Sequence, residues 1–390
     1  MKKNKRLIFL ILVTLLVVAL GLSACQPAPA TEEAAEEAAP APEEEVEEAE
    51  PAEEAEEVQE PLRIAFLYGS TANDYSWNQL WDEGRQALDE HFGDKVETFY
   101  VEMVPWSEEA THIMEQVIAD GADVVVETSN LGDFYYAVVE AHPEVKFFSA
   151  NPAVHENEVS YMFDVFSAHY INGVAAGAVS ETGKIGYVAS FPAPWNNAWM
   201  SAMVLGIRSV NPEATLQVTY VGSYYDPPTV TQASQALADA GVDVLMSYPN
   251  VDASMSVAEE RGLWTFGRYH PMGDFAPNQY VTTFLVESGN LFISEVQAIL
   301  DGTWEGGRSK YINIGDDIYL DAWGPNVPQD VIDQTQAAYD EILGGYNPFI
   351  GPILDTEGNV AVPDGEVGLS KDLNIWMGID WLVAGTESTE

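Results

Sequence analysis

The chain has 390 residues, of which 63 are acidic and only 15 are basic, so its formal net charge at pH 7 is −48. This balance argues against nucleic acid and anionic lipid surfaces as partners, because no basic stripe is present to neutralise phosphates. A single cysteine excludes a disulfide within the chain, so the fold must depend on a hydrophobic core.

Residues 1–24 have the pattern of a secretory signal peptide, with four Lys or Arg residues in 1–6 and an apolar run to Leu20. Leu22-Ser23-Ala24-Cys25 then matches the lipobox of bacterial lipoproteins, with the only cysteine at the point of cleavage and lipidation. An uncleaved anchor helix is the alternative, but the run is short for a membrane span. We expect an exported protein, lipid-anchored through Cys25 to the extracytoplasmic face of the cell membrane, in a periplasm or at the cell surface.

After Cys25, the segment to Glu60 consists mostly of Ala, Pro and Glu. Such a composition buries too little apolar surface to offset its ordering entropy, so we predict that residues 25–60 are the lipidated cysteine and a disordered acidic spacer. The spacer holds 15 acidic residues and the signal four basic ones, which leaves 48 acidic against 11 basic residues, a net of about −37, in the rest. This excess suggests a saline or acidic medium; a family-wide acidic surface is the alternative.

Beyond Pro61, short apolar runs alternate with stretches of helical spacing, which is typical of βαβ units on a parallel sheet. The remaining length is too great for one simple core, so we predict an α/β fold with two similar doubly wound parallel-sheet lobes. The first predicted helix starts at about Ser76. The predicted strands lie near residues 63–68, 96–101, 123–127, 145–149, 184–190, 215–221, 243–247 and 263–267.

A faint internal repeat supports the division into two lobes. Gly121-Ala122-Asp123-Val124 returns 120 residues later as Gly241-Val242-Asp243-Val244. We predict a first lobe of residues 61–165 plus about 286–320, and a second lobe of residues 166–285 plus about 321–390. Chain crossings near 163–166, 282–286 and 319–323 would form a hinge.

Aromatic and amide side chains follow the predicted strands in both lobes. Because ligands bind at the carboxyl ends of parallel strands, these loops predict a cleft that stacks a flat ring and reads its edge. For each aromatic residue the alternative is simple packing between the lobes, and for Asn78 it is a hydrogen bond at a helix N-terminus. The predicted ligand-binding residues are Asp74, Tyr75, Trp77, Asn78, Ser129, Asn130, Phe191, Trp195, Tyr248, Asn250, Asp252, Tyr269 and His270.

Motifs for catalysis and metal binding are missing from the sequence. It contains no GxSxG elbow, HExxH, P-loop or GxGxxG, and its six histidines lack metal-ligand spacing. Asp316, Asp317 and Asp321 lack the regular spacing of a calcium loop, so a solvated acidic turn is the better interpretation. We expect no cofactor, no metal and no enzymatic activity, and an exported enzyme is disfavoured because no paired acid and base is evident.

Several segments carry a resemblance to a known family, among them DYSWNQLWDEGR, HYINGVAAGAVSETGKIGYVASFPAPW, SYYDPPTVTQASQALADAGVDV and PFIGPILDTEGNVAVPDGEV. From about Arg63 onward the chain resembles the basic membrane protein family of ABC-transporter substrate-binding lipoproteins. The resemblance implies the type I periplasmic-binding-protein fold, with two lobes joined by a hinge. It also implies that a small purine-type ligand is captured and delivered to a membrane permease.

The resemblance assigns ligand contacts to Trp77 and Asn78 in the first lobe and a stacking ring to the turn 248–252 in the second. Where the nucleoside-binding branch has an Asp for the ribose hydroxyls, this chain has Arg268-Tyr269-His270-Pro271. A Lys expected near residues 286–287 is also replaced. We therefore predict a nucleobase such as adenine rather than a nucleoside, bound by a monomer that partners an ABC permease. A sugar-binding protein of the same fold and a tethered sensor without a transporter are the alternatives.

Overall fold

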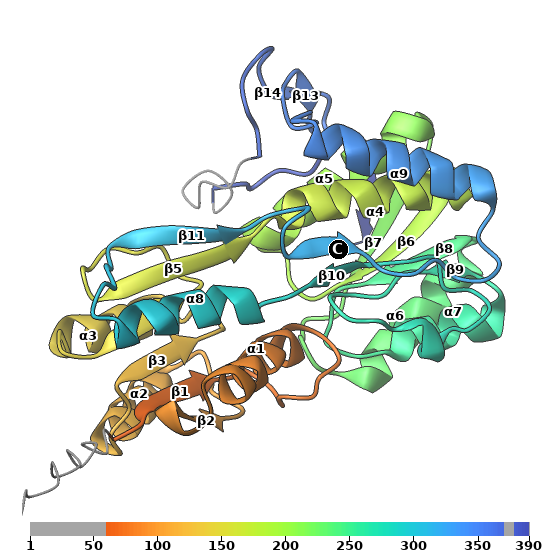
Figure 1. Ribbon diagram of the computed structural model, residues 1–390. Helices are drawn as coiled ribbons and strands as arrows, with labels where there is room; N and C mark the ends of the chain where they lie inside the picture. Colours follow the sequence, from red (N-terminus) through yellow and green to blue (C-terminus); the bar gives the residue numbers. More distant parts are fainter. Residues whose placement is uncertain (1–59, 370–377, 390) are drawn as a thin grey trace, which may run out of the picture. The chain divides into compact units, whose positions relative to one another are not determined.

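The computed structural model describes residues 60–369 and 378–389 (Figure 1). The predicted signal peptide, Cys25 and the spacer up to residue 59 lie outside the described residues. None of the helices in these described ranges is long and apolar enough to cross a membrane.

The first lobe is built on a six-stranded sheet with the order β11-β5-β4-β3-β1-β2, in which all neighbours run parallel. Four of its strands match predicted ones, whereas β5 and β11 were not predicted. Its strands are β1 (Leu62–Leu67), β2 (Val96–Val101), β3 (Val124–Glu127), β4 (Lys146–Ser149), β5 (Glu158–Phe163) and β11 (Arg308–Ile312).

The second lobe is built on a five-stranded parallel sheet with the order β15-β7-β6-β8-β9. The last described strand, β15, comes from the C-terminal end of the chain and pairs with β7 at the sheet edge. Its strands are β6 (Lys184–Ala189), β7 (Thr215–Tyr220), β8 (Val244–Ser247), β9 (Trp264–Thr265) and β15 (Thr386–Thr389). Two parallel sheets confirm the predicted fold class.

Each sheet is covered by helices on both faces, because alternate strand residues are apolar on both sides. In β1, Ile64 and Phe66 pack with α1 and α8, whereas Ala65 and Leu67 pack with α2 and α3. In the second lobe α4 and α5 cover one face, and α6 and α7 cover the other. These helices are α1 (Trp77–Phe92), α2 (Glu108–Ala119), α3 (Asp133–Ala141), α4 (Val165–Val179), α5 (Pro194–Val210), α6 (Pro227–Asp239), α7 (Ala253–Arg261) and α8 (Gly289–Leu300).

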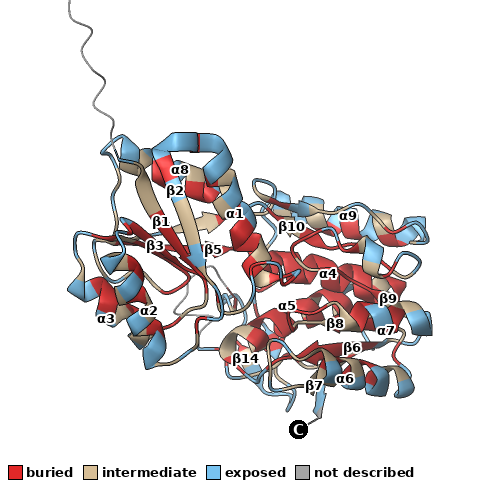
Figure 2. Cartoon of the chain, turned by 90° about the horizontal axis from the view of Figure 1, so that it is seen from below, coloured by how far each residue is buried: buried red, intermediate tan, exposed pale blue. Residues whose placement is uncertain are grey.

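Helix α4 is buried at nearly every position, since α5, the second sheet and α9 (Gln329–Leu343) surround it (Figure 2). Its contact with α5 is close because glycines lie at the crossing. A Cβ atom on Gly206 would stand 2.0 Å from the carbonyl oxygen of Tyr170, and one on Gly173 would stand 2.2 Å from that of Met203. No larger side chain fits there without moving backbone.

Three segments connect the lobes, and they lie near the positions where the chain crossings were predicted. The chain passes from β5 into α4 at residues 163–165, returns through β10 (Phe284–Val286) into α8, and passes back through β12 (Ile318–Leu320). Strands β10 and β12 pair antiparallel, so two of the crossings brace each other. The exact division of the lobes stays a prediction. The remaining short elements are η1 (Gly93–Lys95), η2 (Gly273–Phe275), β13 (Ile353–Leu354) and β14 (Val360–Val362).

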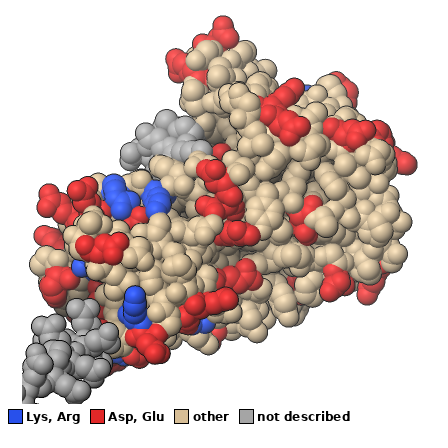
Figure 3. All heavy atoms as spheres, viewed as in Figure 1, with Lys and Arg blue, Asp and Glu red and all other residues tan. Residues whose placement is uncertain are grey.

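The acidic excess appears on the surface. Asp and Glu side chains are scattered widely over the face seen in Figure 3, whereas Lys and Arg occur at few places on it. Like charges repel across such a surface, and salt screens the repulsion.

Candidate functional site

The loop after β1 is held by the carboxylate of Asp74. It accepts hydrogen bonds from the backbone N–H groups of Ser76, Asn78 and Gln79 at 3.0 to 3.3 Å, and so satisfies donors at the start of α1. The Asn78 side chain donates to Asp74 at 2.7 Å and accepts from the Gly69 N–H at 3.2 Å. Both residues were predicted to bind ligand, and in this structure their polar atoms shape the loop.

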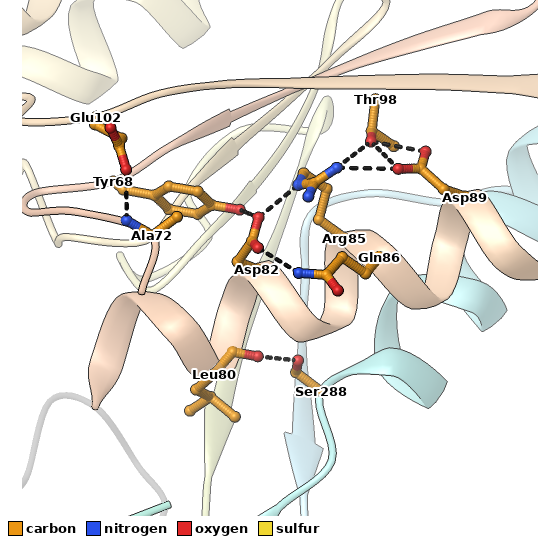
Figure 4. A network of polar contacts seen from close by, with 10 residues as sticks. All are labelled: Tyr68, Ala72, Leu80, Asp82, Arg85, Gln86, Asp89, Thr98, Glu102 and Ser288. Carbon is orange, nitrogen blue, oxygen red and sulfur yellow. Dashed lines mark hydrogen bonds and ion pairs between the residues drawn. The ribbon is translucent and has the colours of Figure 1, made fainter. Parts of the chain in front are cut away.

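The body of α1 is fixed against the first lobe by a second polar network (Figure 4). The hydroxyl of Tyr68 donates to Asp82 at 3.0 Å, and Arg85 pairs with the same carboxylate at 2.5 Å. Burial raises the pKa of Tyr68 far above its ordinary value, with the Asp82 charge adding to the effect, so the phenol remains a donor. Ser288, from a segment distant in sequence, donates to the Leu80 carbonyl at 2.6 Å. These contacts therefore hold α1 in place against the first lobe.

Trp77, at the first position of α1, lies among rings from both lobes. Its ring centroid is 5.6 Å from that of Phe163 and 6.0 Å from that of Tyr269. Its indole N–H donates to the Thr128 carbonyl at 2.6 Å. Trp77 is thus oriented by the end of β3 as well as by its own helix.

A second aromatic group surrounds Tyr224, in the loop after β7. Its ring lies 5.2 Å from that of Phe191 and 6.1 Å from that of Tyr248. It also contacts Trp106 of the first lobe, with ring centroids 5.6 Å apart and the two planes inclined by 31°. The Trp106 indole donates to the Ser129 carbonyl at 2.9 Å. The predicted set contains Phe191 and Tyr248 but omits this pair of rings from opposite lobes.

The omission has a simple cause. Trp106 follows β2 and Tyr224 follows β7, so the rule that ligands bind at carboxyl ends of strands applies to both residues. The prediction used only the loops after the first, third, fifth, seventh and eighth expected strands. Applying the same rule to every strand would have included them.

The other predicted residues of the first lobe lie near these rings. Tyr75 adopts the left-handed backbone region with φ of 53°, is 49% exposed, and meets Phe275 edge to face at 5.2 Å. Asn130 also has a positive φ, of 55°. Ser129 donates its N–H to the Glu127 carboxylate, so the turn after β3 is held from within the sheet. Positive φ values at non-glycine residues are uncommon and gather at functional loops.

In the second lobe, Asn250 lies next to the Tyr224 loop, since its N–H donates to the Tyr224 carbonyl at 2.7 Å. Asp252 precedes α7, and its side chain makes no capping hydrogen bond. Trp195 lies in the first turn of α5, and its hydrogen bond opposes the rise in the Tyr224 pKa that burial causes. A binding role for each of these residues stays a prediction.

His270 joins the two lobes. Its Nε2 lies 3.0 Å from the Ser76 carbonyl oxygen, and its Nδ1 lies 3.1 Å from the Glu83 carboxylate. Burial raises the pKa of Glu83, but the hydrogen bond and charge of His270 outweigh it and lower the pKa overall. His270 is 5% exposed, so the contact is well shielded on the second-lobe side. We call these three residues the His270 latch.

Below the second-lobe rings lies a cavity of about 20 Å³, room for about one water molecule. Its walls come from α4, α5, β6, β8, β10 and the segment after β9. A purine is far larger, so ligand entry requires the rings or the lobes to move. The lining residues are His169, Asn172, Tyr187, Met203, Met246, Ser247, Tyr248, Phe266, Gly267, Arg268, Tyr269 and Phe284.

Polar side chains lie among the mostly apolar and aromatic residues of the cavity lining. The Nδ1 of His169 lies 2.7 Å from the Val165 carbonyl, and burial lowers the His169 pKa to about 4 despite that bond. The imidazole is therefore neutral, donates from Nδ1 and presents Nε2 as an acceptor. Arg268 donates from Nη1 and Nη2 to the carbonyls of Ser247, Pro249 and Val251. Sequence reasoning noted Arg268 only as a departure from the nucleoside branch and did not include His169.

No group of three or more His, Cys, Asp or Glu side chains in the described ranges could hold a metal ion. The ring-lined loops instead offer stacking surfaces and hydrogen-bonding groups. Two parallel-sheet lobes, linked by three crossings and meeting at their strand-end loops, define a two-lobed solute-binding protein of the type I periplasmic class.

Comparisons with known proteins agree with this class. The family model described as "ABC transporter substrate-binding protein PnrA-like" matches residues 62–338, and the chain belongs to this family, Bmp. The predicted resemblance to the basic membrane protein family is thereby confirmed. Substrate-binding proteins of ABC importers are extracytoplasmic, and the family binds substrates rather than transforming them.

Two curated relatives differ in the ligand that they are named for. The chain is 36% identical to a candidate ABC transporter glucose-binding protein of Haloferax volcanii over 291 residues, 73% of each chain. It is 31% identical to a purine-binding protein of Brucella abortus over 336 residues, 85% of this chain and 95% of the relative.

A solved ABC transporter solute-binding protein from Conexibacter woesei has the same fold, with a TM-score of 0.60 and 22% identity. The match covers 73% of this chain and 97% of that one.

Proposed function

We propose that this protein captures a purine base between its two lobes and delivers it to the permease of an ABC importer. Ligand would enter when the lobes separate, stack on the rings of one lobe, and favour the closed arrangement by contacting both. The lobes would move about the three crossing segments, and the closed form would be recognised by the permease.

The observation that carries this proposal is the convergence of aromatic rings from both lobes at the strand ends. Trp77 and Trp106 come from the first lobe, and Tyr224 and Tyr248 from the second. A flat heterocycle gains stacking energy on such rings, about 1 to 3 kcal/mol per base in other proteins. The name of the Brucella relative supports a purine as the heterocycle.

A free base suits the site better than a nucleoside. Ribose hydroxyls are held best by a carboxylate, and the described lining of the second-lobe cavity contains Arg268 but no Asp or Glu. The predicted carboxylate of the first lobe, Asp74, already accepts from three backbone N–H groups. These features favour a nucleobase over its nucleoside.

A sugar is the second candidate, because the Haloferax relative is named for glucose and is 36% identical. Aromatic rings stack on the apolar face of a pyranose as well as on a purine. A purine is the better candidate, because a flat ring covers more of an aromatic face than a pyranose chair does.

The test is calorimetric titration and thermal shift of the purified protein with purine bases, their nucleosides and monosaccharides. A ligand at one hundred times its Kd adds about 2.7 kcal/mol of stability. We expect a base to bind, its nucleoside to bind at least tenfold more weakly, and Tyr224→Ala to weaken base binding at least tenfold. Tyr225→Ala is the matched control, since Tyr225 is 58% exposed. Binding of sugars alone would reject the purine proposal.

We also propose that Cys25 carries the lipid anchor and that the acidic segment up to Glu60 holds the lobes away from the membrane. Cys25→Ser should shift the protein from the membrane fraction to the soluble fraction after cell lysis. An unchanged membrane fraction would contradict the anchor.

A further inference from the structure

Arg268 holds an unusual position at the second-lobe cavity. Three of its five N–H donors go to backbone carbonyls of the loop 247–251. Within residues 60–369 and 378–389 the Nε–H and the second Nη2 proton donate no hydrogen bond, and no carboxylate forms an ion pair with Arg268. The guanidinium therefore holds the loop 247–251 through both Nη1 protons and one Nη2 proton. The Nε–H and the other Nη2 proton can donate to another partner.

The electrostatics around Arg268 reinforce this. Burial lowers its pKa, and the Asp74 carboxylate and nearby tyrosine hydroxyls only partly oppose the effect. A guanidinium nevertheless stays charged in proteins, so the cavity wall carries a positive charge that neutral carbonyls alone contact. A partly buried cation of this kind is stabilised best by an electron-rich acceptor.

Other residues of the cavity lining supply acceptors. Asn172 is 3% exposed, and its Oδ1 has no hydrogen-bond partner; the Oγ of Ser247 is also buried without one. Both residues line the cavity, as does His169, whose neutral ring has an acceptor at Nε2 because Nδ1 donates to the Val165 carbonyl. The cavity thus contains two N–H donors of Arg268 together with acceptor groups. Such a set distinguishes heterocycles by the donors and acceptors on the edges of their rings.

We propose that Arg268 makes this site specific for 6-oxopurines, such as hypoxanthine, over adenine. This inference rests on the proposed function. Two adjacent acceptors, O6 and N7, lie on one edge of a 6-oxopurine, and a guanidinium reads that edge in a bidentate manner. The neighbouring N1–H is a donor for which Asn172 and His169 offer acceptors. Adenine has an amino group in place of O6 and so directs a donor at the fork.

The experiment compares hypoxanthine and adenine, which differ in this edge, by calorimetric titration of the wild-type protein and of Arg268→Gln. The wild type should bind hypoxanthine at least tenfold more tightly than adenine, and Arg268→Gln should reduce that ratio to less than threefold. Arg268→Lys, which keeps the charge without the fork, should lie between them. Arg261→Gln is the matched control, because Arg261 lies in the same lobe and pairs only with Asp239 at the surface.

A purely structural role for Arg268 gives a different result. If it served only to clamp the loop 247–251, Arg268→Gln would weaken both bases by the same factor and leave the ratio unchanged, which would overturn the inference. Equal binding of hypoxanthine and adenine by the wild type would overturn it as well, while leaving the purine proposal intact. Failure of every purine to bind, with sugars binding instead, would overturn the proposed function and the Arg268 assignment together.

Discussion

Replacing His270 by alanine should weaken ligand binding without unfolding either lobe. The side chain spans the lobes, with one ring nitrogen 3.0 Å from the Ser76 carbonyl and the other 3.1 Å from the Glu83 carboxylate. Both acceptors belong to α1 or its N-cap, whereas His270 follows β9. The latch therefore exists only while the lobes are in contact, and its loss should favour their separation.

The size of the effect follows from these two contacts. A net hydrogen bond contributes about 0.5 to 1.5 kcal/mol, and the pair with Glu83 belongs at the lower end because that carboxylate is 49% exposed. Together they amount to about 1 to 2 kcal/mol. If ligand binds tightly only to the closed form and the open form predominates without ligand, the affinity falls by the same free energy, about 5- to 30-fold.

Calorimetric titration of whichever ligand stabilises the wild type measures this loss, with the melting temperature as a check on folding. His142→Ala is the matched control: His142 also lies between two acceptors, Glu115 and Glu144, but all three belong to the first lobe. Its affinity should equal that of the wild type.

The same assay separates a latch from a direct ligand contact. Glu83→Gln should weaken binding modestly, and the double variant with His270→Ala should weaken it by less than the sum of the two single effects, because the pair is already broken. Additive effects, or an affinity of His270→Ala within twofold of the wild type, would refute the reasoning.

Two further predictions concern stability. Burial raises the pKa of Glu127 from 4.5 to about 7, so its contribution to stability, on the order of 3 kcal/mol, is present below pH 4.5 and is lost as the pH rises towards 7. Urea unfolding between pH 4.5 and 8 should therefore show the free energy of unfolding falling with pH, and Glu127→Gln should flatten this slope. An unaltered slope in Glu127→Gln would assign the pH dependence to another group. Gly206→Ala places a Cβ atom 2.0 Å from the Tyr170 carbonyl oxygen. The free energy of unfolding in urea should fall by about 2 kcal/mol or more, even after the gain in helix propensity. A variant as stable as the wild type would show that α4 and α5 can separate freely.

The latch shows where sequence reasoning reached its limit. His270 was predicted as a site residue because it follows a strand, and it does lie where the lobes meet. Its partners could not be predicted, since Ser76 is 194 residues away and only the packing of the lobes brings them together. Asp74 and Asn78 illustrate the same limit, because their residue types suit a ligand as well as they suit the hydrogen bonds of their own loop.

The sequence by itself determined the two-lobed parallel α/β fold, the family and most strand positions. These depend on local features: runs of apolar residues, turn residues between them, and short segments typical of the family. Only the tertiary structure decided that Trp106 faces Tyr224, that β11 and β15 return from the C-terminal part to the two sheets, and that Arg268 clamps one loop. Such pairings join residues far apart in the chain, and their energy arises only when both lobes are packed, so no local pattern encodes them.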